Sequence, residues 1–153
     1  MKFLFQFAFA TALAALPVET LAQEIDASRN PASILTEADS LDRFKWVARP
    51  VIVFADSPND PRFIEQIGLL HERSDALFDR DVVIIADTNP DTPTEIRKKL
   101  RPRGFSLVLV GKDGEIELRK PIPWAVRELT HVIDKMPLRQ QEIRDSNRAP
   151  GPS

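Results

Sequence analysis

Three short apolar runs constrain the fold of this chain more than any other feature. They cover residues 51–55, 82–86 and 106–110, and all three are rich in aliphatic residues, most of them β-branched. Runs without polar alternation are typical of strands that are buried on both faces of a sheet. Between the first two runs, apolar residues recur at helical spacing from Phe63 to Phe78. The sequence therefore predicts two buried strands joined by a helix, and then a third buried strand.

The remaining segments complete the order of elements. Residues 94–100 predict a short basic helix with Ile96 and Leu100 facing inward, and Asp113-Gly114 predicts a tight hairpin turn before a strand at 116–119. A last helix is expected at 124–136. A strand–helix–strand unit requires a parallel pair, whereas the hairpin requires an antiparallel pair. This order, βαβ and then ββα, predicts an α/β, thioredoxin-like fold with a mixed central sheet and helices on both faces.

The first 22 residues have the pattern of a secretory signal peptide. Lys2 is followed by a mostly apolar run at 3–16, which is shorter than the roughly 20 residues that span a bilayer. Pro17 ends this run, and Thr20-Leu21-Ala22 offers small residues for cleavage after Ala22. We therefore expect a periplasmic or secreted protein with no stable membrane insertion once the signal is removed.

The rest of the chain divides into three parts. Residues 23–40 are expected to form an extended or partly helical lead-in, and residues 41–144 a single domain. Residues 145–153 hold two prolines, one glycine and no large apolar residue, which predicts a disordered tail. The formal net charge of −2 gives no general attraction to nucleic acid.

The sequence contains no cysteine. Thiol–disulfide exchange and thiol peroxidase chemistry both require a thiolate, so these 153 residues cannot supply either activity. At the loop where a redox protein of this pattern carries two cysteines, the chain reads Ser57-Pro58-Asn59-Asp60-Pro61. Phe105 stands where such a protein has a cis-proline before its third strand.

Several segments together resemble a known family. They are residues 44–50, 60–62, 107–114 and 133–139, followed by Glu142 and Arg144. Over about residues 41–144 the chain resembles the bacterial secreted family called domain of unknown function 4174. That family is thioredoxin-like and distantly related to peroxiredoxin-like domains of sushi-repeat-containing and coiled-coil-domain-containing matrix proteins. The resemblance implies a fold and an export route, and it brings no catalytic residues.

Candidate catalytic and metal-binding groups do not converge in the sequence. His71 lies about three helical turns, or roughly 15 Å, beyond Ser57 and Asp60, which are better explained as helix caps. His71 and Asp75 share a helix face but lack further ligands, and turn or cap roles explain the aspartates that could form a calcium site, Asp56, Asp60, Asp87 and Asp91. The sequence predicts no catalytic residue, no cofactor and no metal site.

Residues for binding a partner are easier to nominate. The loop Pro58, Asn59, Asp60 and Pro61, together with a groove beside Phe105 at 104–106, is one candidate surface. Basic residues between 97 and 103, chiefly Arg97 and Arg101, suit either an anionic partner or a solvated helix face. Trp124, Trp46 and the exposed edge of the last strand are further candidates.

These observations favour an exported, non-redox module that binds an unknown protein or peptide in the cell envelope. Two alternatives stay open. One is a structural protein that associates with itself, and the other, less favoured, is an enzyme that uses metal- or carboxylate-assisted chemistry in place of a thiol.

Overall fold

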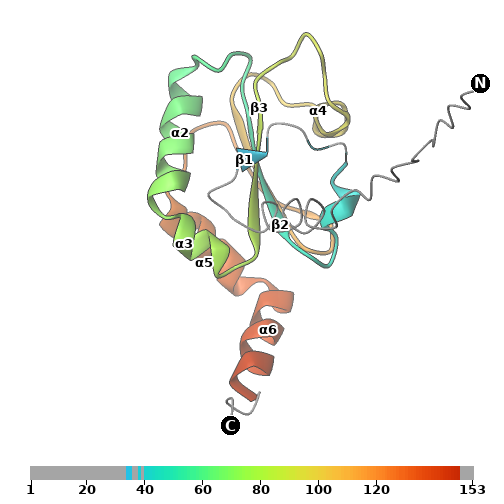
Figure 1. The fold of residues 1–153 in the computed structure, drawn as a ribbon, viewed down its shortest axis with the longest axis vertical. Coiled ribbons are helices and arrows are strands. Elements are labelled where there is room, and N and C mark those ends of the chain that lie inside the picture. The colour runs from blue at the N-terminus through green and yellow to red at the C-terminus, as the bar shows by residue number, and fades with distance from the viewer. Residues whose placement is uncertain (1–33, 36–37, 39, 149–153) are drawn as a thin grey trace, which may run out of the picture.

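The computed structural model describes residues 34–35, 38 and 40–148, and it contains a five-stranded mixed sheet (Figure 1). β1 and β2 both run parallel to β3, whereas β4 is antiparallel to β2 and β5 is antiparallel to β4. The predicted thioredoxin-like α/β fold is thereby confirmed. In spatial order the strands are β1 (Ile34–Leu35), β3 (Val82–Asp87), β2 (Arg49–Phe54), β4 (Ser106–Val110) and β5 (Ile116–Lys120).

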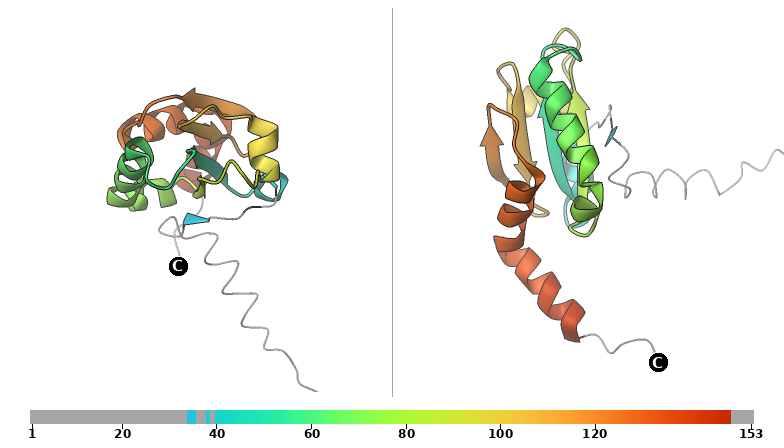
Figure 2. Two further views of the ribbon diagram at one scale, coloured as in Figure 1. Left: turned by 90° about the horizontal axis from the view of Figure 1, so that it is seen from above. Right: turned by 90° about the vertical axis from the view of Figure 1, so that its left-hand side faces the viewer.

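Helices cover both faces of the sheet (Figure 2). Along β2, Val51 and Val53 point to one hydrophobic cluster and Ile52 and Phe54 to the other, because successive side chains of a strand alternate between faces. The first cluster lies under α2 (Pro61–Glu72), α3 (Ser74–Phe78) and α5 (Val126–Lys135), and the second under η1 (Asp42–Phe44) and α4 (Glu95–Leu100).

The central strand β2 begins two residues earlier than predicted and contains Pro50. The amide of Arg49 donates to the carbonyl of Asp81 on the β3 side, at 2.7 Å. The nitrogen of Pro50 therefore faces β4, and pairing with β4 starts only at Val51. Proline is tolerated at this position because no ladder hydrogen bond is lost.

The predicted first helix is two helices. Asp60 caps α2 by accepting a hydrogen bond from the amide of Arg62 at 2.9 Å, and Pro61 occupies the first turn, as expected. The helix ends at Arg73, whose φ of −127° leaves the helical range, and α3 follows. Phe78 is consequently exposed rather than buried as predicted.

The hairpin and the basic helix agree with the sequence. Gly114 has a φ of +88°, and Gly111 donates to the carbonyl of Glu115 at 2.8 Å. Ile96 and Leu100 of α4 are buried. β5 lies at the sheet edge, but a bulge interrupts its register at Leu109/Val110, a device that discourages pairing with a partner strand.

The carboxyl-terminal part differs from the prediction. α6 (Pro137–Arg148) extends into the segment from 145 that was expected to be disordered, and it projects beyond the sheet (Figure 1). Pro137 starts this helix, at a position where the missing amide has no intrahelical partner to lose. The predicted signal peptide and residues 149–153 lie outside the described residues, as does most of the lead-in. Within the described ranges, no helix has the length and apolar character needed to cross a membrane.

Candidate functional site

The carboxyl ends of β2 and β3 meet at one edge of the sheet because these strands are parallel neighbours. The segments that follow them, 55–60 and 88–94, therefore lie beside each other. In open α/β sheets this is the edge at which ligands commonly bind. Most residues predicted to contact a partner follow one of these strands, so this edge is the candidate site.

The loop after β2 is stabilised by local hydrogen bonds. The Ser57 hydroxyl accepts from the amide of Asn59 at 3.1 Å, and the Arg62 guanidinium donates to the Asp60 carboxylate at 2.9 Å. That side-chain hydrogen bond lowers the pKa of Asp60 below its usual range. Asp60 is therefore an ionised cap, and the exposed surface of the loop comes from Pro58, Asn59 and Pro61.

Arg97 has a different role from the one predicted. Its side chain is buried, and its Nε donates to the Asp87 carboxylate at 2.8 Å. One terminal nitrogen of its guanidinium donates to the carbonyls of Ala55, at 2.8 Å, and Asp87, at 2.9 Å. Arg97 thus joins the ends of β2 and β3 and is not available to a partner. Arg101, at the end of α4, is exposed as predicted.

A second candidate, Phe105, is also wrong as a surface residue. It is 1% exposed and belongs to the cluster under α2 and α5, with its ring 5.6 Å from the guanidinium carbon of Arg62. Ser106 is buried as well. The described residues contain no cis peptide bond. Residues 104–106 therefore close this side of the loop.

A groove of about 650 Å³ lies on the other side of β2. Its walls are the loop after β2 and the segment between β3 and α4. From the sequence, residues 87–93 were predicted only as a loop, although their two prolines were a signal of a stiff wall. The groove is lined by the apolar residues Ala38, Pro58, Phe63 and Ala86 and by small polar residues that include Asn89 and Thr92.

The two tryptophans lie outside this groove. Trp124 packs half-buried against the core, and its backbone exchanges two hydrogen bonds with the buried amide of Gln66, at 2.7 and 3.0 Å. Trp46 is 70% exposed beside the hairpin, where its amide donates to the carbonyl of Lys112 at 2.7 Å. The structure does not bring either residue to the candidate site.

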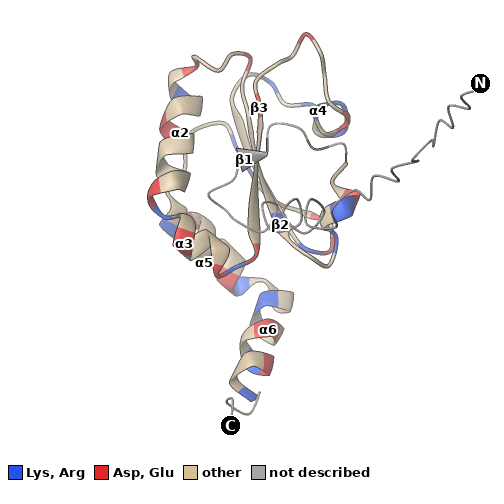
Figure 3. Ribbon diagram, viewed as in Figure 1, with Lys and Arg blue, Asp and Glu red and all other residues tan. Residues whose placement is uncertain are grey.

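Catalytic chemistry finds no support in this geometry. His71 lies in the last turn of α2, roughly 15 Å along the helix axis from the Asp60 cap. Asp87 already binds Arg97, so it is not available as a cation ligand. Across the described residues, no three metal-ligating side chains gather. Acidic and basic residues are interspersed along the chain (Figure 3).

Comparison with known proteins places the chain in a family. The family described as "Domain of unknown function (DUF4174)" matches residues 40–142, so the chain belongs to it. Among solved structures, chloroplastic thioredoxin z is similar over 67% of this chain and 94% of its own, at 16% identity and a TM-score of 0.48. Thioredoxin z is described as defining a novel type-specific target recognition, and identity at this level conveys no activity to this chain.

Proposed function

We propose that this protein is an exported, non-redox thioredoxin-like module that binds a protein or peptide segment in the cell envelope. The observation that carries the proposal is the groove of about 650 Å³ at the carboxyl ends of β2 and β3. This volume is in the range of ligand-binding clefts in proteins. The absence of cysteine from the sequence supports binding over thiol chemistry.

The lining of the groove indicates what kind of segment it suits. Pro58, Phe63 and Ala86 supply apolar surface, whereas Asn89 and Thr92 supply groups that can hydrogen-bond a ligand backbone. An extended segment with an apolar side chain, and with no need for a charged partner, matches this combination.

The walls of the groove are held by interactions that need no ligand. Thr94 donates its hydroxyl to Asp87 at 2.8 Å, and the same carboxylate binds Arg97. These bonds fasten the start of α4 to the end of β3. A groove that is ordered beforehand loses less entropy on binding, which favours affinity for a short segment.

Export is the second part of the proposal, and it rests on the signal-peptide pattern of residues 1–22. The expected kinship with bacterial secreted proteins belongs to this part too. Fractionation followed by N-terminal sequencing tests it. We expect the mature chain to begin at Gln23, and a full-length chain confined to the cytoplasm would contradict export.

Site-specific photo-crosslinking tests the binding surface. A photo-reactive residue is placed at Asn89 in the groove, or at Glu72 at the far end of α2 as a control, and adducts are identified in cells. We expect a discrete adduct from position 89 only. The purified partner should then bind the parent protein and lose at least tenfold in affinity when Thr92→Trp fills the groove.

The matched control is Glu72→Trp, which adds the same ring to an exposed position outside the groove. It should leave affinity unchanged. A partner that binds both variants equally would show that the groove is not its site.

A further inference from the structure

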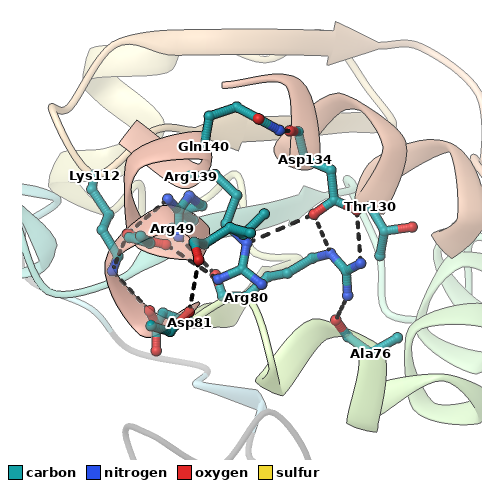
Figure 4. Close-up of polar contacts among 12 residues, drawn as sticks. Arg49, Ala76, Arg80, Asp81, Lys112, Thr130, Asp134, Arg139 and Gln140 are labelled. Atoms are coloured by element: carbon teal, nitrogen blue, oxygen red, sulfur yellow. Dashed lines mark hydrogen bonds and ion pairs between the residues drawn. The ribbon is translucent and has the colours of Figure 1, made fainter. Parts of the chain in front are cut away.

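A buried arginine lies at the amino end of β2, at the opposite end of the sheet from the groove. Arg49 is 0% exposed. One terminal nitrogen of its guanidinium donates to the carbonyl of Arg80 at 2.9 Å, and the other donates to the Glu142 carboxylate of α6 at 3.0 Å (Figure 4). Its Nε has no hydrogen-bond partner among the described residues. This role of Arg49 was not predicted, because the residue precedes the expected strand and its carboxylate partner is 93 positions away.

Lys112, from the β4–β5 hairpin, lies beside Arg49. Its side chain is 11% exposed, and its Nζ donates at 2.7 Å to both Asp81 and Glu142. Arg49 and Lys112 therefore bind the same carboxylate oxygen of Glu142. We call this pair the socket. Each of its cations is also held by the body of the domain, through Arg80 and Asp81, so the socket does not depend on α6 for its position.

α6 is attached to the body by polar groups. None of its residues is buried. Besides Glu142, it is held by Arg139, which pairs with Asp134, and by Gln140, which donates to the Asp134 carbonyl (Figure 4). By contrast, the preceding helix α5 buries Val126, Leu129 and Ile133. Release of α6 would leave both hydrophobic clusters closed.

One residue separates the two helices. Met136 is extended, with φ −64° and ψ 136°, and it is buried against the first cluster. A change of its backbone angles redirects α6 and leaves α5 in place. Short connections of this kind are the usual hinges of exchanged elements.

We propose that α6 is an exchangeable arm, and that the socket of one copy binds Glu142 from α6 of a second copy in a reciprocal dimer. An empty socket is costly, because it leaves a fully buried guanidinium without its carboxylate. Any movement of α6 therefore calls for a replacement carboxylate. α6 of a second copy is the occupant whose fit the contacts in Figure 4 demonstrate, since the same groups would meet in either arrangement.

Carbodiimide crosslinking tests the exchange on the unaltered protein. The reagent joins an amine directly to a carboxylate, and Lys112 Nζ lies 2.7 Å from Glu142. Equal amounts of unlabelled and heavy-nitrogen protein are mixed, incubated and crosslinked, and the Lys112–Glu142 product is examined by mass spectrometry. We expect products that combine one light and one heavy peptide, rising with protein concentration towards half of the total, the statistical limit.

Two variants serve as controls. Glu142→Gln removes the carboxylate and should abolish both the mixed product and the dimer seen by sedimentation. Asp145→Asn makes the same change at an exposed position of α6 and should alter neither. Products that are never mixed, at any concentration up to the solubility limit, would show that α6 binds only its own chain and would overturn the proposal. A dimer that persists in Glu142→Gln would overturn it as well.

Discussion

At the scale of single residues, two glycines show how the same substitution can act in opposite directions. Gly114 has a φ of +88° in the hairpin turn, and an added Cβ would lie 2.6 Å from the Lys45 side chain. Gly68 lies inside α2, and an added Cβ there would meet nothing within 4 Å. Glycine is needed at the first position because side chains disfavour a positive φ, whereas at the second it only weakens the helix.

We expect Gly114→Ala to lower the free energy of unfolding by about 1 kcal/mol or more, and Gly68→Ala to raise it by up to about 1 kcal/mol. Urea denaturation of the two variants beside the parent protein measures both. Equal stability of Gly114→Ala and the parent would mean that the turn does not require its left-handed conformation.

At the scale of elements, α4 shows how one buried charge attaches a short helix. The helix has only two turns, which are marginal by themselves. Ile96 and Leu100 pack it on the sheet, and Arg97 binds Asp87 and the end of β2. Its neighbour Lys98 forms only an exposed pair with Glu95.

Substituting one partner of the buried pair should therefore be severe. We expect Arg97→Met to lower the free energy of unfolding by about 3 kcal/mol, because the Asp87 carboxylate stays buried without its cation. The matched change Lys98→Met should alter it by less than about 1 kcal/mol. Chemical denaturation distinguishes them, and similar losses from both variants would count against a structural role for Arg97.

At the scale of the whole molecule, Glu142 couples the last helix to the first central strand across 93 residues. Burial by itself would raise the pKa of this carboxyl. The hydrogen bonds and charges of Lys112 and Arg49 outweigh burial and lower its pKa from 4.5 to about 2. Folding thus favours the ionised form of Glu142, which makes stability depend on pH.

The sign of this dependence follows from the lowered pKa. The contribution of Glu142 to stability is complete above the ordinary pKa of 4.5 and is lost as the pH falls towards about 2. We expect the difference in unfolding free energy between the parent and Glu142→Gln to shrink over that interval. Denaturation at a series of pH values measures it, with Asp145→Asn as the control. A difference that stays constant with pH would contradict the assigned ion pair.

The sequence by itself determined the features that depend on neighbouring residues. The apolar runs specified the strands, Asp60 and Pro61 the start of α2, and Asp113-Gly114 the hairpin, because each of these signals acts within a few residues. The absence of cysteine excluded thiol chemistry without reference to any structure.

Only the tertiary structure decided which polar and aromatic residues are buried. Arg97 lies in a run of basic residues that could equally face solvent, and its burial depends on a carboxylate ten positions away. Arg49 and Glu142 are paired only because the sheet brings the start of β2 to α6. Phe105 was expected at the surface and lies in the core. A charge is buried only where distant segments supply its partner, and such an arrangement exists only after the chain has folded.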